Sequence, residues 1–131
     1  MAERADKKVA QYLGSNVERL TLGENLFNGP SFPGAGLAVF CIVSGGALPV
    51  TIVGTTTGVY SSRVDIRIRG ERGKYDEGVT FAKQVQQAIQ YSQLGTDFIM
   101  VRVTGSSPAY IGQNNNGDPE WVIFTLVTFE E

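Results

Sequence analysis

Basic side chains are concentrated in one short stretch of the chain. Five of the eleven lysines and arginines fall within twelve positions, as Arg63, Arg67, Arg69, Arg72 and Lys74. Guanidinium groups pair in a bidentate way with phosphates or carboxylates. Arg63, Arg67 and Arg69 are separated by even numbers of residues, so in a strand they lie on one face and form a row. Such a row can bind nucleic-acid phosphates or the carboxylates of another protein subunit.

Three interpretations of the arginine row stay open at this stage. It can face a neighbouring subunit, it can be a solvated face with Asp65 as a local partner, or it can contact DNA. The formal net charge of −2, from 13 acidic and 11 basic residues, argues against a generally basic nucleic-acid binder. We favour the subunit contact.

The sequence offers little material for catalysis. It has no histidine and one cysteine, which excludes Ser-His and Cys-His pairs, histidine metal sites and CxxC zinc motifs. Cys41 stands in an apolar run and is expected to be a buried, inert thiol. Asp97, Asp118 and Glu120 come nearest to an acidic cluster, but general acid-base work needs carboxylates held close together. We therefore expect no catalytic, metal or cofactor site and a protein that is not an enzyme.

Two loop regions are candidates for binding. Residues 23–36 are rich in Gly and Pro, but they lack the order GxxxxGK[ST] of a phosphate-binding loop. We expect a turn-rich loop in which Leu26, Phe27 and Phe32 reach the core or a neighbouring subunit. Residues 105–120 read as a long polar loop, and loops of that length are usually functional or mobile.

The elements that must position these residues follow from hydrophobic periodicity. Tyr60, Val64, Ile66 and Ile68 alternate with the arginines in a strand, and from Tyr75 the apolar spacing becomes helical. The predicted elements are a helix over 3–14, strands over 37–43, 50–53, 59–69, 98–104 and 121–129, and a helix over 75–92. The order α-β-β-β-α-β-β predicts an α+β two-layer sandwich in which a mixed, mostly antiparallel sheet packs on two helices. We expect residues 1–131 to form one domain.

Composition adds two expectations. Charged residues make up 18% of the chain, below the roughly 25% usual for a globular domain, so either other subunits cover part of the surface or polar uncharged loops fill it. No apolar run approaches the roughly 20 residues that span a bilayer, and no signal peptide is evident. We expect no membrane contact.

Several segments together resemble a known family. They are "VAQYL" from Val9, "GENLFNGP" from Gly23, "SGGALP" from Ser44, "VDIRIRGERGKYDEG" from Val64 and "SSPAYIGQNNNGDPEWVIFTLVTFEE" from Ser106. Their order and spacing, from Val9 to Phe129, resemble the tail-terminator (tail-completion, minor capsid) proteins of long-tailed bacteriophages. None of these segments is a catalytic signature.

The resemblance implies a compact protein that assembles as a homo-oligomeric, hexameric ring in the tail or neck of the virion, after synthesis in the host cytoplasm. The ring would cap the tail tube protein, end its polymerisation and present a surface to the head-tail connector or head-closure protein. DNA would pass the central channel without specific binding. The alternatives are another neck component, such as a head-closure or tail-tube-related subunit, and a small DNA-binding domain that uses the basic strand.

The resemblance and the charge pattern together nominate two sets of site residues. The candidates for subunit contacts are Arg63, Arg67, Arg69, Arg72, Glu24 and Glu120. The candidates for loops that contact the tube or the connector are Phe27, Phe32, Tyr110, Asn115 and Asp118. In the family's acidic-Gly loop this chain carries Asn116-Gly117, so an ionic role of that loop is not expected.

Overall fold

The fold is an α+β sandwich of two helices on one six-stranded mixed sheet, as the hydrophobic pattern predicted. The computed structural model describes residues 4–29, 34, 36–51, 58–95 and 98–130, with side chains for all of these except 46–51 and 99. In chain order the elements are α1 (Ala5–Asn16), β1 (Leu26–Asn28), β2 (Ala38–Thr51), β3 (Gly58–Arg69), α2 (Tyr75–Ile89), β4 (Phe98–Val103), β5 (Ala109–Gln113) and β6 (Pro119–Glu130).

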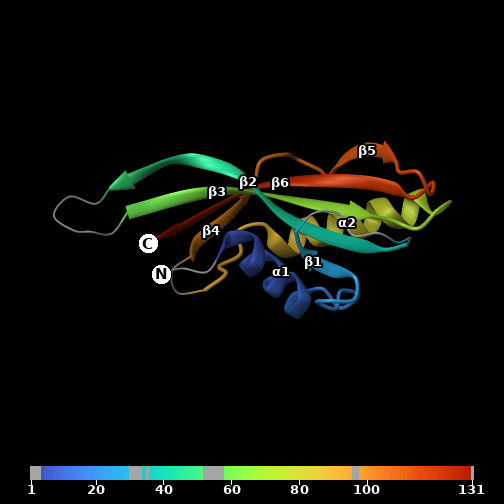
Figure 1. Ribbon diagram of the computed structural model, residues 1–131, viewed down its shortest axis with the longest axis horizontal. Helices are drawn as coiled ribbons and strands as arrows, with labels where there is room; N and C mark the ends of the chain where they lie inside the picture. The colour runs from blue at the N-terminus through green and yellow to red at the C-terminus, as the bar shows by residue number, and fades with distance from the viewer. Residues whose placement is uncertain (1–3, 30–33, 35, 52–57, 96–97, 131) are drawn as a thin grey trace.

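The sheet is ordered β1-β2-β3-β6-β4, with β5 also paired to β6, and it is open at its edges. Only β1 and β2 run parallel, and the other described pairs are antiparallel. Strand β3 is central: Ile66 lies opposite Cys41 of β2 and Ile123 of β6. Figure 1 shows β2 and β3 running together beyond the helices at one end of the molecule.

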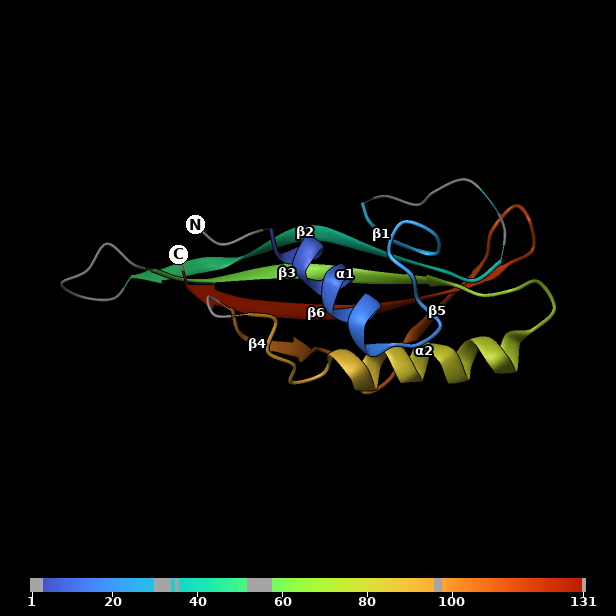
Figure 2. The same ribbon diagram turned by 90° about the horizontal axis from the view of Figure 1, so that it is seen from below.

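One face of the sheet carries the core. Val64, Ile66 and Ile68 of β3 are buried, as are Phe81 and Val85 on the apolar side of α2. Burial of each such side chain contributes roughly 1.5–3 kcal/mol to stability. Both helices lie on this face of the sheet, as Figure 2 shows. In the described part of the chain, neither helix is long and apolar enough to cross a membrane.

Strand β2 is longer than the sequence pattern indicated. Residues 44–49, which separate the predicted strands over 37–43 and 50–53, join residues 38–43 and 50–51 in one strand of 14 residues, and residues 52 and 53 lie outside the described residues. Strand β2 accommodates the extra residues through two register shifts in its pairing with β3, between Val43 and Gly46 and between Ala47 and Val50. Gly45 has a φ of 109°, which only glycine adopts readily. The glycines therefore mark bulges in a continuous strand.

The prediction of a long polar loop over 105–120 is wrong for its middle part. Residues 109–113 form β5, which pairs with the start of β6 through Tyr110 opposite Trp121. Strand β5 is mostly exposed, so it lacks the apolar alternation by which a strand is recognised in a sequence. This strand makes the element order α-β-β-β-α-β-β-β.

Helix α1 continues past the glycine that we expected to end it. A Cβ at Gly14 would lie 3.3 Å from Leu26 Cδ2, so this glycine permits close packing between α1 and β1. The helix ends at Asn16, whose Nδ2 donates a hydrogen bond of 2.8 Å to Tyr12 O. At the second helix, Asp76 and Glu77 occupy the first turn, where the helix dipole favours carboxylates.

Gly78 allows α2 to lie directly over Trp121. A Cβ at this position would come within 2.3 Å of the indole, and Trp121 is itself buried. Gly78→Ala should therefore force the helix away from the sheet and lower the free energy of unfolding by about 1–3 kcal/mol. Urea denaturation measures the loss. The matched control is Gly105→Ala, where the nearest atom would be 3.6 Å away, and equal stability of the two variants would contradict this packing.

Cys41 is fully buried in the sheet, as expected, and burial followed by the charge of Asp6 raises the pKa of its thiol. The unfolded chain loses this proton near pH 8.5, whereas the folded chain keeps it. The difference in the free energy of unfolding between the protein and a Cys41→Val variant should therefore be constant below that pH. Above it, the free energy of unfolding of the protein should fall, relative to the variant, by up to about 1.4 kcal/mol per pH unit. Denaturation of both proteins between neutral pH and pH 10 tests this, and parallel profiles would refute it.

Candidate functional site: the open face of the sheet

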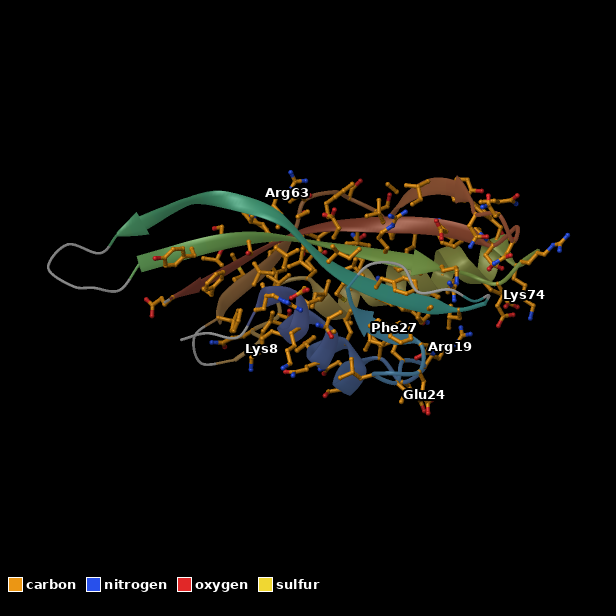
Figure 3. The ribbon with its side chains drawn as sticks, viewed as in Figure 1. Lys8, Arg19, Glu24, Phe27, Arg63 and Lys74 are labelled. Atoms are coloured by element: carbon orange, nitrogen blue, oxygen red, sulfur yellow. The ribbon has the colours of Figure 1, made fainter. Side chains whose placement is uncertain are left out.

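The sheet face opposite the helices carries the charged side chains of β3. Arg63, Asp65 and Arg67 alternate with the buried residues of the same strand. In Figure 3, Arg63 points away from α1 and from the helix layer. Among the described residues, no helix lies on this side of the sheet (Figures 1 and 2). The predicted placement of Arg63 and Arg67 on the outer face is confirmed.

Arg69 does not take part in the exposed row that the sequence predicted. Arg69 is buried, with a relative exposure of 7%, and Gly34 and Gly36 lie against its guanidinium. Its Nε donates a hydrogen bond of 2.8 Å to Gly36 O, and its guanidinium lies 5.5 Å from the Phe40 ring centroid. Arg69 therefore holds a loop of its own chain, and a direct contact to another subunit is inconsistent with its burial.

Asp118 belongs to the same arrangement. It is 2% exposed and its Oδ2 accepts a hydrogen bond of 3.4 Å from Gly36 N. Asn116 donates from Nδ2 to Gly34 O at 3.1 Å, which adds a second link between the two loops. The carboxylate of Asp118 is thus enclosed by its own chain, and its contact with the tube or connector stays a prediction.

The remaining loop candidates are scattered. Phe27 is half-buried and stacks on Phe40, with ring centroids 5.6 Å apart. Tyr110 is 46% exposed and meets Tyr75 edge to face at 5.3 Å. Asn115 is exposed in the turn between β5 and β6, whereas Phe32 lies outside the described residues. No two of these described candidates lie together in one site. Their contacts with a tube or connector stay predictions.

The open part of the outer face combines arginines with apolar side chains. Cross-strand register places Arg63 of β3, Leu126 of β6 and Arg102 of β4 in one row. The next row holds Ile42, Asp65 and Phe124. We call the following residues the open face: Ile42, Arg63, Asp65, Arg67, Arg102, Phe124 and Leu126.

The sequence pattern did not single out Arg102, although this residue lies in the predicted strand over 98–104. The signal that could have found it is the alternation with Val101, which is fully buried. Arg102 and Arg63 are both exposed, and neither forms an ion pair with a described residue. Two strand spacings of about 4.8 Å separate their backbones. Two unpaired guanidinium groups therefore flank Leu126.

Arg67 has a partner within the chain. Its Nη2 lies 3.8 Å from Glu120 Oε1, and both side chains are partly exposed. An exposed pair at this distance contributes little to stability. Glu120 was proposed as a carboxylate for a neighbouring subunit, but the structure places it beside Arg67 on the same molecule. Asp65 in turn accepts a hydrogen bond of 3.1 Å from Ser44 Oγ.

The other two cationic candidates lie in the turn after β3, away from the open face. Arg72 is exposed and borders Gly117, where an added Cβ would lie 3.3 Å from Arg72 Nε. Lys74 Nζ lies 3.1 Å from Glu71 and 3.9 Å from Glu77. The hydrogen bond and charge of Glu71, followed by the charge of Glu77, raise the pKa of Lys74.

The arrangement is suited to recognising another macromolecule. The open face has exposed apolar area, since Phe124 is 38% exposed, and unpaired guanidinium groups beside it. Arginines and aromatic residues are enriched in protein interfaces. In the part of the chain that the structure describes, no group of three or more His, Cys, Asp or Glu residues could hold a metal ion. No protein-family profile matches the chain, and a search of curated proteins found no significant relative.

Alanine substitutions compare the buried Arg69 with the exposed Arg63. Arg69→Ala should lower the free energy of unfolding by about 1–3 kcal/mol, because it leaves Gly36 O without its charged donor and exposes Phe40. The matched control Arg63→Ala should change it by less than about 0.5 kcal/mol. Chemical denaturation compares them. Equal effects would show that the loop contacts of Arg69 contribute nothing.

Proposed function

We propose that this protein is a structural component of a bacteriophage virion, a tail terminator that assembles as a ring at the end of the tail tube. The resemblance in segment order from Val9 to Phe129 supports the proposal. The ring ends tube polymerisation and gives the head connector its docking surface. The protein acts through surfaces and not through catalysis.

The observation that carries this proposal is the open face. A ring subunit needs a rigid lateral surface, and a sheet backed by a packed helix layer supplies one. Arg63 and Arg102, which flank Leu126 and have no ion pair with a described residue, give that surface electrostatic specificity, and Phe124 in the next row adds apolar contact. A long β2–β3 hairpin beyond the helices offers further contact length (Figure 1).

The charge of the chain is compatible with DNA passing through the ring. The net charge of −2 means that the subunit as a whole does not attract phosphates. The arginines of the open face are then best placed against protein, where carboxylates can pair with them. A channel wall made of other surfaces would let DNA move without sticking.

A second candidate function rests on the same two arginines. Arg63 and Arg102 lack carboxylate partners among the described residues, so they are free to meet phosphates of a nucleic acid. A small DNA-binding domain would use the open face in this way. Its signature is a binding constant that falls steeply with salt concentration.

The terminator proposal predicts rings. Native mass spectrometry and negative-stain imaging over a range of protein concentrations should show closed rings of about six copies, because a repeated contact that closes gives a cyclic assembly. Binding of the protein to duplex DNA is measured at low and moderate salt for comparison. A protein that stays monomeric at every concentration, yet binds DNA with a steep salt dependence, would replace the terminator proposal by the DNA-binding one.

A further inference from the structure

We infer that the open face of one copy docks on the acidic end of the helix layer of a second copy. The acidic end is defined by four exposed carboxylates, Glu18, Glu24, Asp76 and Glu77. The inference rests on the proposed ring and identifies the two surfaces that meet in it. Because the contact joins two different surfaces, each copy can bind one neighbour through its open face and another through its acidic end.

The charge of the open face disfavours pairing with itself. Of its three arginines, only Arg67 has a carboxylate partner among the described residues. The open face carries three arginines and one carboxylate, Asp65, which already accepts a hydrogen bond from Ser44. Two open faces brought together would therefore oppose a net positive charge, which is unfavourable across an interface. The acidic end of the same molecule carries exposed carboxylates, and Asp76 among them has no ion pair with a described residue. A second copy therefore offers complementary charge elsewhere.

The acidic end provides a shaped receptor for a guanidinium group. A hollow of about 310 Å³ lies at the start of α2 and is lined by Arg19, Asp76, Glu77, Thr80, Phe81 and Gln84. Glu18 and Glu24 are exposed in the segment that also carries Arg19. A carboxylate can accept two parallel hydrogen bonds from an arginine, which fixes its orientation as well as its position.

The cations near this hollow are already engaged. Arg19 lies over the Phe81 ring, 5.2 Å from its centroid, and Lys74 is shared between Glu71 and Glu77. Asp76 has no ion pair with a described residue, although it opens the helix. An arginine from another copy would supply the missing partner of Asp76.

The two surfaces lie on opposite sides of the molecule. Figure 3 shows Arg63 above the sheet, and Glu24 and Arg19 below it beside the end of α1. A contact between unlike surfaces leaves one of each free on the outer copies of a pair. Further copies can then be added in the same way until the assembly closes. This is the geometry that a ring requires.

Charge reversal with mixing tests the inference. The sheet variant is Arg63→Glu with Arg102→Glu, and the helix variant is Asp76→Lys with Glu77→Lys. Each should weaken self-association by at least about tenfold in sedimentation or mass photometry. An equimolar mixture should assemble again, because each variant then presents the surface that the other needs.

Controls separate charge effects from folding. Glu18→Lys with Glu24→Lys leaves the first turn of α2 unchanged and should act like the helix variant. Lys7→Glu with Lys83→Glu makes the same charge change as the sheet variant on exposed residues outside both surfaces, and should assemble like the wild type. Circular dichroism and urea denaturation identify any variant that fails to fold.

The outcomes distinguish this inference from the proposed function. Wild-type rings that are insensitive to both reversals, or a mixture that does not reassemble, would overturn the inference and leave the terminator proposal standing. A wild-type chain that never self-associates up to its solubility limit would overturn both. Loss in each variant with recovery on mixing supports the pairing of the open face with the acidic end.

Discussion

The structure depends on the two-sided character of β3. Its inward residues Val64, Ile66 and Ile68 are buried in the core between the sheet and the helices, and its outward positions carry charge. Because β3 is paired along its length with β2 and β6, its alternation sets which side chains of three strands face the core. A slip of one residue would bring arginines under the helices. The same register that builds the core thus creates the open face.

The arginines of β3 have different roles because, among the described residues, Gly34 and Gly36 cover Arg69 whereas Arg63 is exposed. Arg69 is hydrogen-bonded to Gly36 and stacked on Phe40, and it helps to fasten the segment that follows β1. Arg63, in contrast, is exposed beside Leu126 and Arg102. Burial, not residue type, separates a structural arginine from one available to a partner.

The proposed assembly requires a rigid surface and protection against unspecific edge pairing. The distal part of β2 is an edge in the described sheet, since β1 pairs only with residues 39–41. Its two register shifts and Pro49 interrupt the regular pattern of donors and acceptors. Such irregularities are how natural sheets avoid pairing edge to edge. Recognition is then left to side chains on the open face, where charge can select the partner.

The sequence by itself determined the sandwich, because alternation in β3 and helical spacing in α2 are local patterns that burial alone produces. It also determined the burial of Cys41 and the outward placement of Arg63 and Arg67. It could not determine that Arg69 is buried, that Arg102 joins Arg63, or that residues 109–113 form a strand. Those features arise from contacts between segments far apart in the chain, such as Gly36 with Arg69 and Leu126 with both arginines. Only the tertiary structure decides them, because the partners of a side chain are not encoded in its own neighbourhood.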